Sequence, residues 1–239
     1  MWYIMNIRSD FRLIANLIEN DSKVLDIGCG DGELLQYLKK EKNIDVRGLE
    51  ISQESVSKAI SRGISAIQGD CEKDLHNYPD NHFDYVILSQ TLQALKDPKS
   101  SIEEMLRIAK FAIISFPNFA HFQNRFQLFF GGKMPVRKSI PYQWYDTPNI
   151  HFCTIKDFEN LCHQMNIAIK RRTYLSSKNR VIYSMIKRIF ANFFAEYGIF
   201  LISKDLAPQN SNEIVMKKKK VATNLSLAPS FMSNRNSRS

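Results

Sequence analysis

The sequence predicts an α/β protein built around one mostly parallel sheet of seven strands. Short apolar strands alternate with segments of helical periodicity in the first half of the chain, the order typical of parallel sheets. The stretch at 83–88 (FDYVIL) is apolar on both faces, as expected of a strand covered by helices on both sides. A glycine-rich turn at 28–32 joins the first strand to a helix, and such turns let a ligand approach the backbone closely.

Periodicity and capping residues predict the elements of the first half. Apolar residues at helical spacing indicate a helix over 8–19, and another is expected over 33–40. Ser52 is a typical N-cap residue for a helix that ends near 61. The strands expected here are 24–27, 46–50, 64–68 and 83–88.

The second half departs from this strict alternation. A helix over 99–110 precedes a strand over 111–116, which Pro117 stops. Residues 117–152 are rich in aromatic residues, Pro and Gly, and we interpret them as a cover segment after the fifth strand, helical around 121–130. The remaining expected elements are a helix from Thr154 to 165, a strand at 167–174, an amphipathic helix at 182–194 and a strand at 197–203.

The apolar C-terminal part of this region raises the question of membrane contact. The stretch 181–202 reaches spanning length, but it contains Lys187, Arg188 and Glu196, which excludes a transmembrane helix. The amphipathic part can lie on a membrane surface or pack on the sheet, and we expect it to pack on the sheet. Residues 1–5 are too short for a signal peptide, and four cysteines without a CxxC pair fit a reducing cytosol, so we expect a cytoplasmic protein.

The positive charge of the chain is concentrated near its end. The 239 residues carry 33 Lys and Arg against 24 Asp and Glu, a net charge of +9. Six basic residues and no acid lie beyond 216, which leaves +3 for residues 1–216. We therefore expect one domain over 1–204 and a disordered Ser/Asn-rich tail over 205–239. The run Lys217–Lys220 can bind RNA or acidic lipid, but a solvated tail is the simpler reading, and nucleic acid is not expected to be the main partner.

The glycine turn carries acidic residues that select among nucleotide ligands. Its spacing is GxGxG, with Glu33 where a pyrophosphate-binding turn has its third Gly. Asp26 lies just before the turn and Asp31 within it, and acids there repel a pyrophosphate but suit a ligand with a cationic amine. Glu50 ends the second strand and can accept both hydroxyls of a ribose, while Asp70, after the third strand, can accept from the amine of a purine. A glycine turn with acids, a ribose-binding acid and a purine-binding acid, in this order along the chain, fit S-adenosylmethionine better than a dinucleotide.

These stretches resemble a known family. VLDIGCGDG (24–32), RGLE (47–50), QGD (68–70) and FDYVILSQTLQ (83–93) are similar to class I S-adenosylmethionine-dependent methyltransferases, which have a Rossmann-like fold. More specifically, SQTLQ, ISFPNF (114–119), GGKMPV (131–136) and YQWYDTPNIHFCTIKDFENLC (142–162) resemble the bacterial methionine biosynthesis family MetW. The resemblance covers about residues 5–204.

The resemblance implies a ligand, a partner and a set of contacts. MetW proteins work with a homoserine O-acyltransferase, MetX, so the chain is expected to bind S-adenosylmethionine or S-adenosylhomocysteine and to support that enzyme. The alternatives are an active methyltransferase on a small molecule and, more weakly, an RNA methyltransferase. The implied ligand contacts are Asp26, Gly28, Cys29, Gly30 and Asp31 in the glycine turn, Glu50 and Ile51, Asp70 and Cys71 beside the adenine, and Ser89 and Gln90 near the methyl group.

Other residues are candidates for substrate or partner contact, while no catalytic residue is assigned. No NPPY-type run follows the fourth strand, which disfavours N-methylation of DNA bases or glutamine, and Gln93 stands where an acid or His base can sit. Asn118, His121 and Arg125 lie beside the expected pocket, where they can bind an acidic substrate or simply belong to a helix surface. The aromatic candidates, which form a lid, an interface or the cover segment's own core, are Tyr142, Trp144, Tyr145 and His151. His151 and Cys153 lack a second pair, so no metal site is expected.

Overall fold

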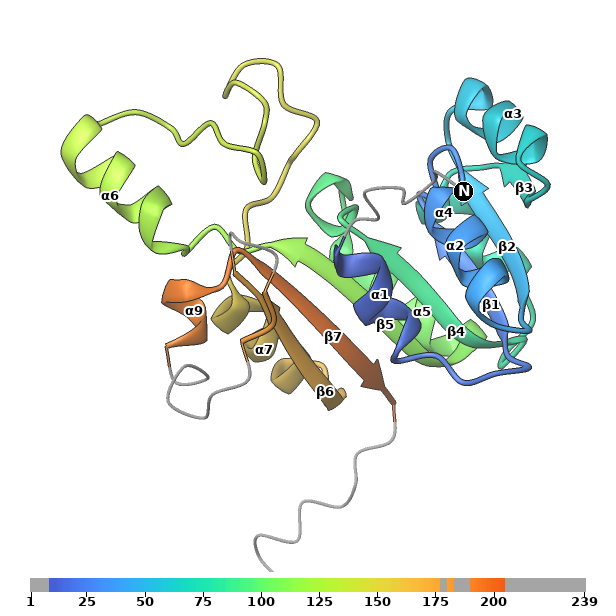
Figure 1. Cartoon of the computed structure of the whole chain (residues 1–239). Coiled ribbons are helices and arrows are strands. Elements are labelled where there is room, and N and C mark those ends of the chain that lie inside the picture. The colour runs from blue at the N-terminus through green and yellow to red at the C-terminus, as the bar shows by residue number, and fades with distance from the viewer. Residues whose placement is uncertain (1–8, 177–179, 183–189, 205–239) are drawn as a thin grey trace, which may run out of the picture. The chain divides into compact units, whose positions relative to one another are not determined.

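The computed structural model describes residues 9–176, 180–182 and 190–204 (Figure 1). Its strands are β1 Lys23–Ile27, β2 Asp45–Glu50, β3 Ser65–Gln68, β4 Phe83–Ser89, β5 Ala109–Pro117, β6 Ala168–Leu175 and β7 Tyr197–Ser203. They form one seven-stranded sheet in the order β3-β2-β1-β4-β5-β7-β6, in which β7 is antiparallel to β5 and β6 and the other neighbours are parallel. The predicted mostly parallel α/β sheet is confirmed.

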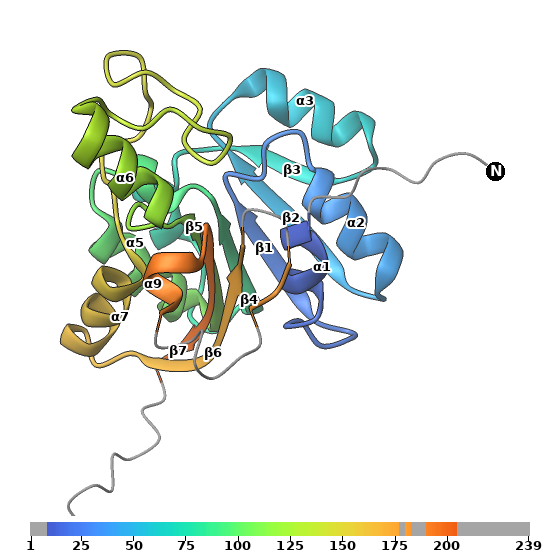
Figure 2. The same ribbon diagram turned by 60° about the vertical axis from the view of Figure 1, so that its left-hand side comes forward.

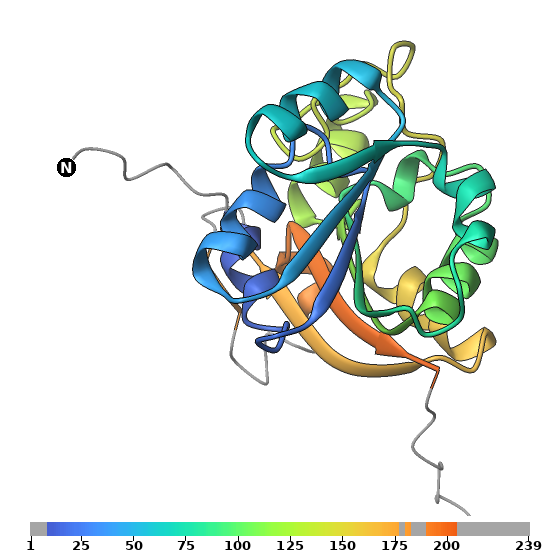
Figure 3. The ribbon, with the colours of Figure 1, turned by 90° about the vertical axis from the view of Figure 1, so that its right-hand side faces the viewer.

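Helices lie on both sides of this sheet, as Figure 3 shows. They are α1 Ser9–Ala15, α2 Glu33–Glu41, α3 Gln53–Ser61, α4 Cys71–Asp74, α5 Pro98–Ile108, α6 Phe122–Gly131, α7 Ile155–Gln164 and α9 Ala191–Phe194, with 3-10 turns η1 Leu75–Asn77 and η2 Leu92–Ala94. None of the helices in the described ranges is long and apolar enough to cross a membrane.

The period-2 alternation of the strands divides the core into two clusters. Leu25 and Ile114 belong to the cluster that includes α5, α7 and α9, whereas Val24 and Ile113 belong to the cluster with α1, α2 and α3. Successive side chains of a strand point to opposite faces, so a strand covered on both sides must be apolar at nearly every position. This explains the continuous apolar runs of the central strands.

Several element boundaries differ from the sequence prediction. The first helix ends at Ala15 rather than near 19, and α5 ends at Ile108, because Ala109 is extended and pairs with Phe83 in the sheet. The short α4 and η1 were not expected. Residues 183–189 of the helix predicted over 182–194 lie outside the described residues. Within its described part, Ala191–Phe194 form α9, and Val181, just before the predicted range, forms a bridge with Leu175.

The cover segment begins where β5 ends. Its helix α6 and the loop that follows stand away from the sheet (Figure 1), with α9 near the start of α6 (Figure 2). Thr154 then starts α7 through a capping box, in which its side chain accepts from Asp157 N–H and the Asp157 carboxylate accepts from Thr154 N–H. Residues 1–205 and 206–239 form separate units, and the predicted tail lies outside the described residues.

Candidate functional site

The glycine turn after β1 has a left-handed backbone at all three glycines. The φ angles are 69° at Gly28, 55° at Gly30 and 78° at Gly32, values that only glycine adopts readily. The Leu49 carbonyl accepts from Gly28 N–H at 2.8 Å, so the turn is fastened to the end of β2. A Cβ atom on Gly28 would lie 2.7 Å from Thr91 Oγ1, so the turn also lies directly against the loop after β4.

Glu50 joins the glycine turn to the start of α3. One carboxylate oxygen accepts from Gly30 N–H at 2.9 Å, and the other accepts from Ser52 N–H at 2.9 Å. Each carboxylate oxygen has two lone pairs, so Glu50 keeps acceptor capacity for two more donors. The side chain predicted to hold the ribose is thus oriented beside the turn by backbone groups.

Asp70 has a local role after β3 as the N-cap of α4. Its carboxylate accepts from Glu72 N–H at 3.1 Å and lies 3.2 Å from the Lys73 ammonium. Its own N–H donates to Asp74 Oδ2 at 2.7 Å. The Gly69 N–H donates to the Glu50 carbonyl at 2.9 Å, which fixes this turn to β2.

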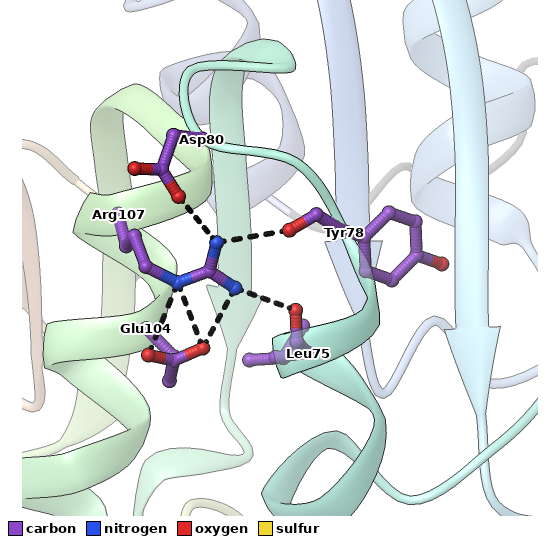
Figure 4. Close-up of polar contacts among 5 residues, drawn as sticks. All are labelled: Leu75, Tyr78, Asp80, Glu104 and Arg107. Carbon is purple, nitrogen blue, oxygen red and sulfur yellow. Dashed lines mark hydrogen bonds and ion pairs between the residues drawn. The ribbon is translucent and has the colours of Figure 1, made fainter.

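A single arginine holds η1 and the turn after it against α5 (Figure 4). The Arg107 guanidinium donates to the carbonyls of Leu75 at 3.0 Å and Tyr78 at 2.9 Å, and pairs with Asp80 at 2.6 Å and Glu104 at 2.8 Å. Charge-assisted bonds of this fork geometry are strong and directional. Because α4 follows directly from Asp70, this network also positions one wall of the candidate site.

A cavity of about 250 Å³ lies where β1, β2 and β3 end. Its lining residues are Ile27, Gly28, Leu49, Glu50, Ile51, Gly69, Asp70, Cys71, Glu72, Thr91, Ala94 and Leu95. Among them are five of the predicted ligand contacts, namely Gly28, Glu50, Ile51, Asp70 and Cys71. Burial, then Asp70 and Glu72, raise the pKa of the Cys71 thiol to about 11, so it is protonated at neutral pH.

The loop after β4 supplies contacts that the sequence did not single out. Thr91, Ala94 and Leu95 line the cavity from η2 and its ends. Their position directly after a central parallel strand is the sequence feature that could have identified them, because ligands of such sheets bind at the carboxyl ends of the strands.

The other predicted contacts in the glycine turn lie outside the cavity lining. Asp26 is buried within β1. Burial is the main cause that raises the pKa of the Cys29 thiol to about 12, and the negative charges of Asp26 and Glu50 raise it further. Cys29 is therefore a neutral core residue. Asp31 pairs with Arg62 at 2.8 Å, so part of its charge is already balanced within the protein.

Ser89 and Gln90 lie at the end of β4, next to the lining loop. Ser89 Oγ is 3.1 Å from Ser115 Oγ of β5. Gln90 has a left-handed backbone with φ 57°, and its amide donates to the Asp10 carboxylate of α1 at 3.1 Å. The strand end is therefore tied to both β5 and the first helix.

Asn118 corrects the expectation of a substrate contact. Its side chain is buried, and its amide nitrogen donates to the carbonyls of Ala195 at 2.8 Å and Asn192 at 3.1 Å. Its amide oxygen accepts from the N–H groups of Ala120 at 3.2 Å and Ile155 at 3.3 Å. These four bonds use the full capacity of the amide. Asn118 therefore fixes the start of the cover segment to α7 and α9.

His121 and Arg125 also lie away from the cavity lining. His121 is buried at the N-cap position of α6, where burial is the main cause that lowers the pKa of its imidazole. The Arg125 guanidinium donates to the Ala120 carbonyl at 2.7 Å and lies 5.7 Å from the centre of the Phe193 ring. Neither residue is placed to bind a ligand of the cavity.

The aromatic candidates of the cover segment are exposed. Trp144 and Tyr145 expose 72% and 71% of their surface, and their rings meet edge to face at 5.6 Å. Tyr142 is exposed as well, so these side chains do not form a core of the cover segment. The segment reaches the lining loop instead through Gln93, whose carbonyl accepts from the N–H groups of Ile150 at 2.8 Å and His151 at 2.9 Å.

Two further features of the described chain bear on ligand chemistry. A larger cavity of about 480 Å³ lies between α1 and β6 and contains none of the predicted site residues. Over residues 9–176, 180–182 and 190–204, no group of three His, Cys, Asp or Glu side chains is placed to hold a metal ion.

Comparisons with known proteins identify the family of the chain. The family model described as methionine biosynthesis protein MetW matches residues 8–202. The bifunctional methionine biosynthesis protein MetXA/MetW of Rhodopirellula baltica is 36% identical over 174 residues, which cover 69% of this chain and 28% of that protein. Ajmaline N-methyltransferase of Rauvolfia serpentina is 35% identical over 36% of this chain and 32% of its own length. This chain thus spans about a third or less of these relatives.

Solved structures share the fold at low sequence identity. A methyltransferase of Thermotoga maritima that depends on S-adenosylmethionine, described as a possible histamine N-methyltransferase, aligns with a TM-score of 0.60 and 19% identity, covering 82% of this chain and 88% of its own. The arrangement of strands and helices is therefore that of class I methyltransferases.

Proposed function

Because this chain belongs to the family of methionine biosynthesis protein MetW, we propose that it binds S-adenosylmethionine or S-adenosylhomocysteine and supports homoserine O-acylation as a partner of the acyltransferase. The ligand half of this proposal concerns the cavity beside Glu50. The partner half concerns the cover segment. Each half has its own test.

The observation that carries the ligand half is the convergence of Gly28, Glu50, Ile51, Asp70 and Cys71 on one cavity of about 250 Å³. These residues come from three separate turns, and each turn was predicted to contact a different part of the same nucleoside. The chemistry suits that ligand, because a carboxylate with spare lone pairs stands beside apolar side chains and a glycine turn.

Individual residues of the cavity would hold separate parts of the ligand. Glu50 would accept the ribose hydroxyls, Ile51 and Cys71 would flank the adenine, and the turn at Gly28 would admit the methionine part. Two acids near the turn, Asp26, which is buried in β1, and Asp31, whose charge Arg62 partly balances, add to the preference for a cation over a pyrophosphate. When bound, S-adenosylmethionine supplies an electrophilic methyl group on a sulfonium.

The partner half is supported by the Rhodopirellula relative. Its name places a MetW part and a MetXA part in one bifunctional protein, and the aligned region makes up 28% of it. Two activities joined in one chain work at a fixed, high effective concentration. We propose that the same two activities associate here as separate chains, with MetX acting as a homoserine O-acyltransferase.

A small-molecule methyltransferase is the second candidate, and the similarity to a plant N-methyltransferase favours it. The surroundings of Ser89 and Gln90 weaken it. These side chains contact Ser115 and Asp10, and Asn118 has no capacity left for a substrate. Release of S-adenosylhomocysteine upon addition of a defined acceptor would favour the methyltransferase over the partner subunit.

Calorimetric titration of the full chain with S-adenosylmethionine tests the cavity. Ile51 lines it and is 67% exposed, so Ile51→Ser removes an adenine contact with little loss of core packing. We expect about tenfold weaker binding, since burying an Ile side chain contributes about 1.5–3 kcal/mol. Ile67→Ser, at a residue of β3 that is 53% exposed and does not line the cavity, is the matched control. Absence of binding by the unmodified protein, or equal loss in both variants, refutes the ligand assignment.

A rate measurement tests the partner half. The homoserine O-acyltransferase of the same organism is assayed alone and with this protein added at a molar excess. We expect a faster rate in the mixture. An unchanged rate, with no complex detected by size-exclusion chromatography, contradicts the partner proposal and leaves the ligand proposal standing.

A further inference from the structure

We propose that the outer face of α6 docks into an apolar, acid-rimmed groove on a partner protein. This face, which we call the α6 aromatic face, consists of Phe126, Phe129 and Phe130. The inference deepens the partner half of the proposed function and depends on it. None of these three residues was singled out by the sequence motifs.

The α6 aromatic face is far more exposed than phenylalanine usually is. Phe129 exposes 81% and Phe130 exposes 75% of their surface, and Phe126 is exposed as well. Their spacing of i, i+3 and i+4 places them on one stripe of the helix. The rings also contact one another, with Phe126 and Phe130 stacked at 5.7 Å and Phe129 edge-on to Phe130 at 4.9 Å. Single exposed apolar residues are normal, but a contiguous cluster of large ones marks an interaction site.

The first turn of α6 is anchored to the protein, through Phe122, which lies on the same stripe one turn before Phe126, and through Asn124 on the opposite side. The Phe122 ring stacks on Phe193 at 5.7 Å and packs near Phe194 at 6.2 Å. Asn124 is buried, and its amide donates to the Phe119 carbonyl at 3.1 Å. The helix therefore has a defined orientation, and its aromatic stripe is held outward. A preordered helix loses little conformational freedom when it binds.

The placement of α6 suits insertion into a groove. Figure 1 shows the helix standing away from the sheet, and Gly132, with φ 58°, is its C-cap. A helix that presents apolar anchors at i, i+3 and i+4 is the form in which amphipathic helices enter hydrophobic grooves. Trp144 and Tyr145 of the same cover segment are exposed as well, and aromatic residues are enriched at interfaces.

Charge around α6 selects the kind of occupant. Residues 119–150 carry one acid, Asp146, and four basic residues, which are Arg125, Lys133, Arg137 and Lys138. A second copy of this chain would bring two positive surfaces together, which opposes association. A protein groove with acidic residues at its rim complements them. The fusion of MetW and MetXA parts in the Rhodopirellula relative favours a protein occupant over an anionic lipid surface.

The test measures binding of the full chain to the homoserine O-acyltransferase of the same organism by biolayer interferometry. The variant is the double substitution Phe129→Ser with Phe130→Ser. The control is Ile60→Ser, at an α3 residue that is 55% exposed and at the opposite end of the sheet (Figure 1). We expect a more than tenfold weaker affinity for the double variant, as for the loss of aromatic anchors at an interface centre, and about the unmodified affinity for the control. Calorimetry with S-adenosylmethionine should give equal affinities for all three proteins, which verifies folding.

Each other outcome overturns the inference in a distinct way. Equal acyltransferase affinity of the double variant and the unmodified chain refutes the docking face but leaves the proposed function intact. No acyltransferase binding by the unmodified chain, with ligand binding retained, refutes the partner half of the proposed function together with the docking face. Self-association that the double substitution abolishes, seen by light scattering, assigns the face to a second copy. Binding to phosphatidylserine vesicles that the double substitution abolishes, without acyltransferase binding, assigns it to a membrane.

Discussion

Gly28 and Gly30 lie two residues apart in one turn, but the methyl group that an Ala substitution would add has different surroundings at the two positions. Both have positive φ, so Ala at either position costs about 1–2 kcal/mol of backbone strain. Only at Gly28 would the added Cβ also lie within 2.7 Å of Thr91 Oγ1, whereas nothing lies within 4 Å at Gly30. We expect Gly28→Ala to lower the free energy of unfolding more than Gly30→Ala, as measured by urea denaturation. Equal losses would show that the contact with Thr91 is relaxed.

Glu50 combines a structural role with its proposed ligand role, and the two are separable by the choice of substitution. Glu50→Ala leaves the N–H groups of Gly30 and Ser52 without their acceptor. Each N–H group that stays buried then lowers the free energy of unfolding by about 1–3 kcal/mol. Glu50→Gln retains one acceptor oxygen for a backbone donor. We expect both variants to bind S-adenosylmethionine weakly, but only the Ala variant to show a large loss of stability in thermal denaturation. Full ligand affinity in the Gln variant would contradict the ribose assignment.

His121 makes stability depend on pH. Burial lowers the pKa of its imidazole below the ordinary value near 6.5, and the favourable effect of Glu196 is smaller. The unfolded chain then binds more protons than the folded chain below about pH 6.5, so the stability present at higher pH is lost as pH falls toward the lowered pKa. Urea denaturation between pH 7.5 and pH 5 should show this loss, and His121→Gln should reduce it. An identical slope in both proteins would assign the effect to other groups.

Sequence reasoning located Glu50 and the glycine turn because strand order fixes where such residues lie. All parallel strands end at one edge of the sheet, so residues after β1, β2 and β3 must meet there. Sequence reasoning did not predict the ion pair of Asp31 with Arg62, because the two residues are 31 positions apart in the chain. Nor did it reveal that Asn118 is saturated by backbone partners, since three of the four belong to distant residues in or next to α9 and α7.

At the scale of elements, α4 and η1 are held by side chains rather than by their own length. Arg107→Met would remove the donors to the carbonyls of Leu75 and Tyr78 (Figure 4), and we expect a loss of about 2 kcal/mol of stability at roughly 1 kcal/mol per bond. Because this turn forms one cavity wall, ligand affinity should fall too. Lys110→Met, which breaks only an exposed pair with Asp84, should change both quantities much less.

The measurement pairs chemical denaturation with ligand calorimetry on the same preparations. Loss of stability without any change in ligand affinity would show that the α4 wall does not depend on Arg107.

The elements α4 and η1 were not predicted from the sequence, and their short length explains why. A four-residue helix followed by a three-residue 3-10 turn carries no periodic signal, so side-chain contacts define it, namely the Asp70 cap, the bond from Asp97 N–H to the Glu72 carboxylate and the bonds of Arg107. Long amphipathic elements such as α2, α5 and α7 were visible in the sequence.

At the scale of the whole molecule, the sheet order shows how the C-terminal part completes the fold. β7 is the last strand of the described residues, but it lies between β5 and β6 and pairs with both. Its Ile199 and Phe200 belong to opposite core clusters, so it contributes to both faces of the sheet. The end of β7 at Ser203 therefore sets the shortest chain that we expect to fold, and the boundary near 204 stays a prediction.

This arrangement predicts opposite results for two truncations. A chain that ends at Lys204 keeps β7 and should retain its thermal midpoint to within about 2 °C, the shift that roughly 0.5–1 kcal/mol produces in a protein of this size. It should also bind S-adenosylmethionine normally. A chain that ends at Glu196 lacks β7, leaves β6 without its only sheet neighbour in the described structure and exposes the core faces of β5, so it should not fold. Circular dichroism melting and ligand calorimetry check both. Unfolding of the longer truncation would show that residues 205–239 contribute to the domain, and the predicted boundary would be wrong.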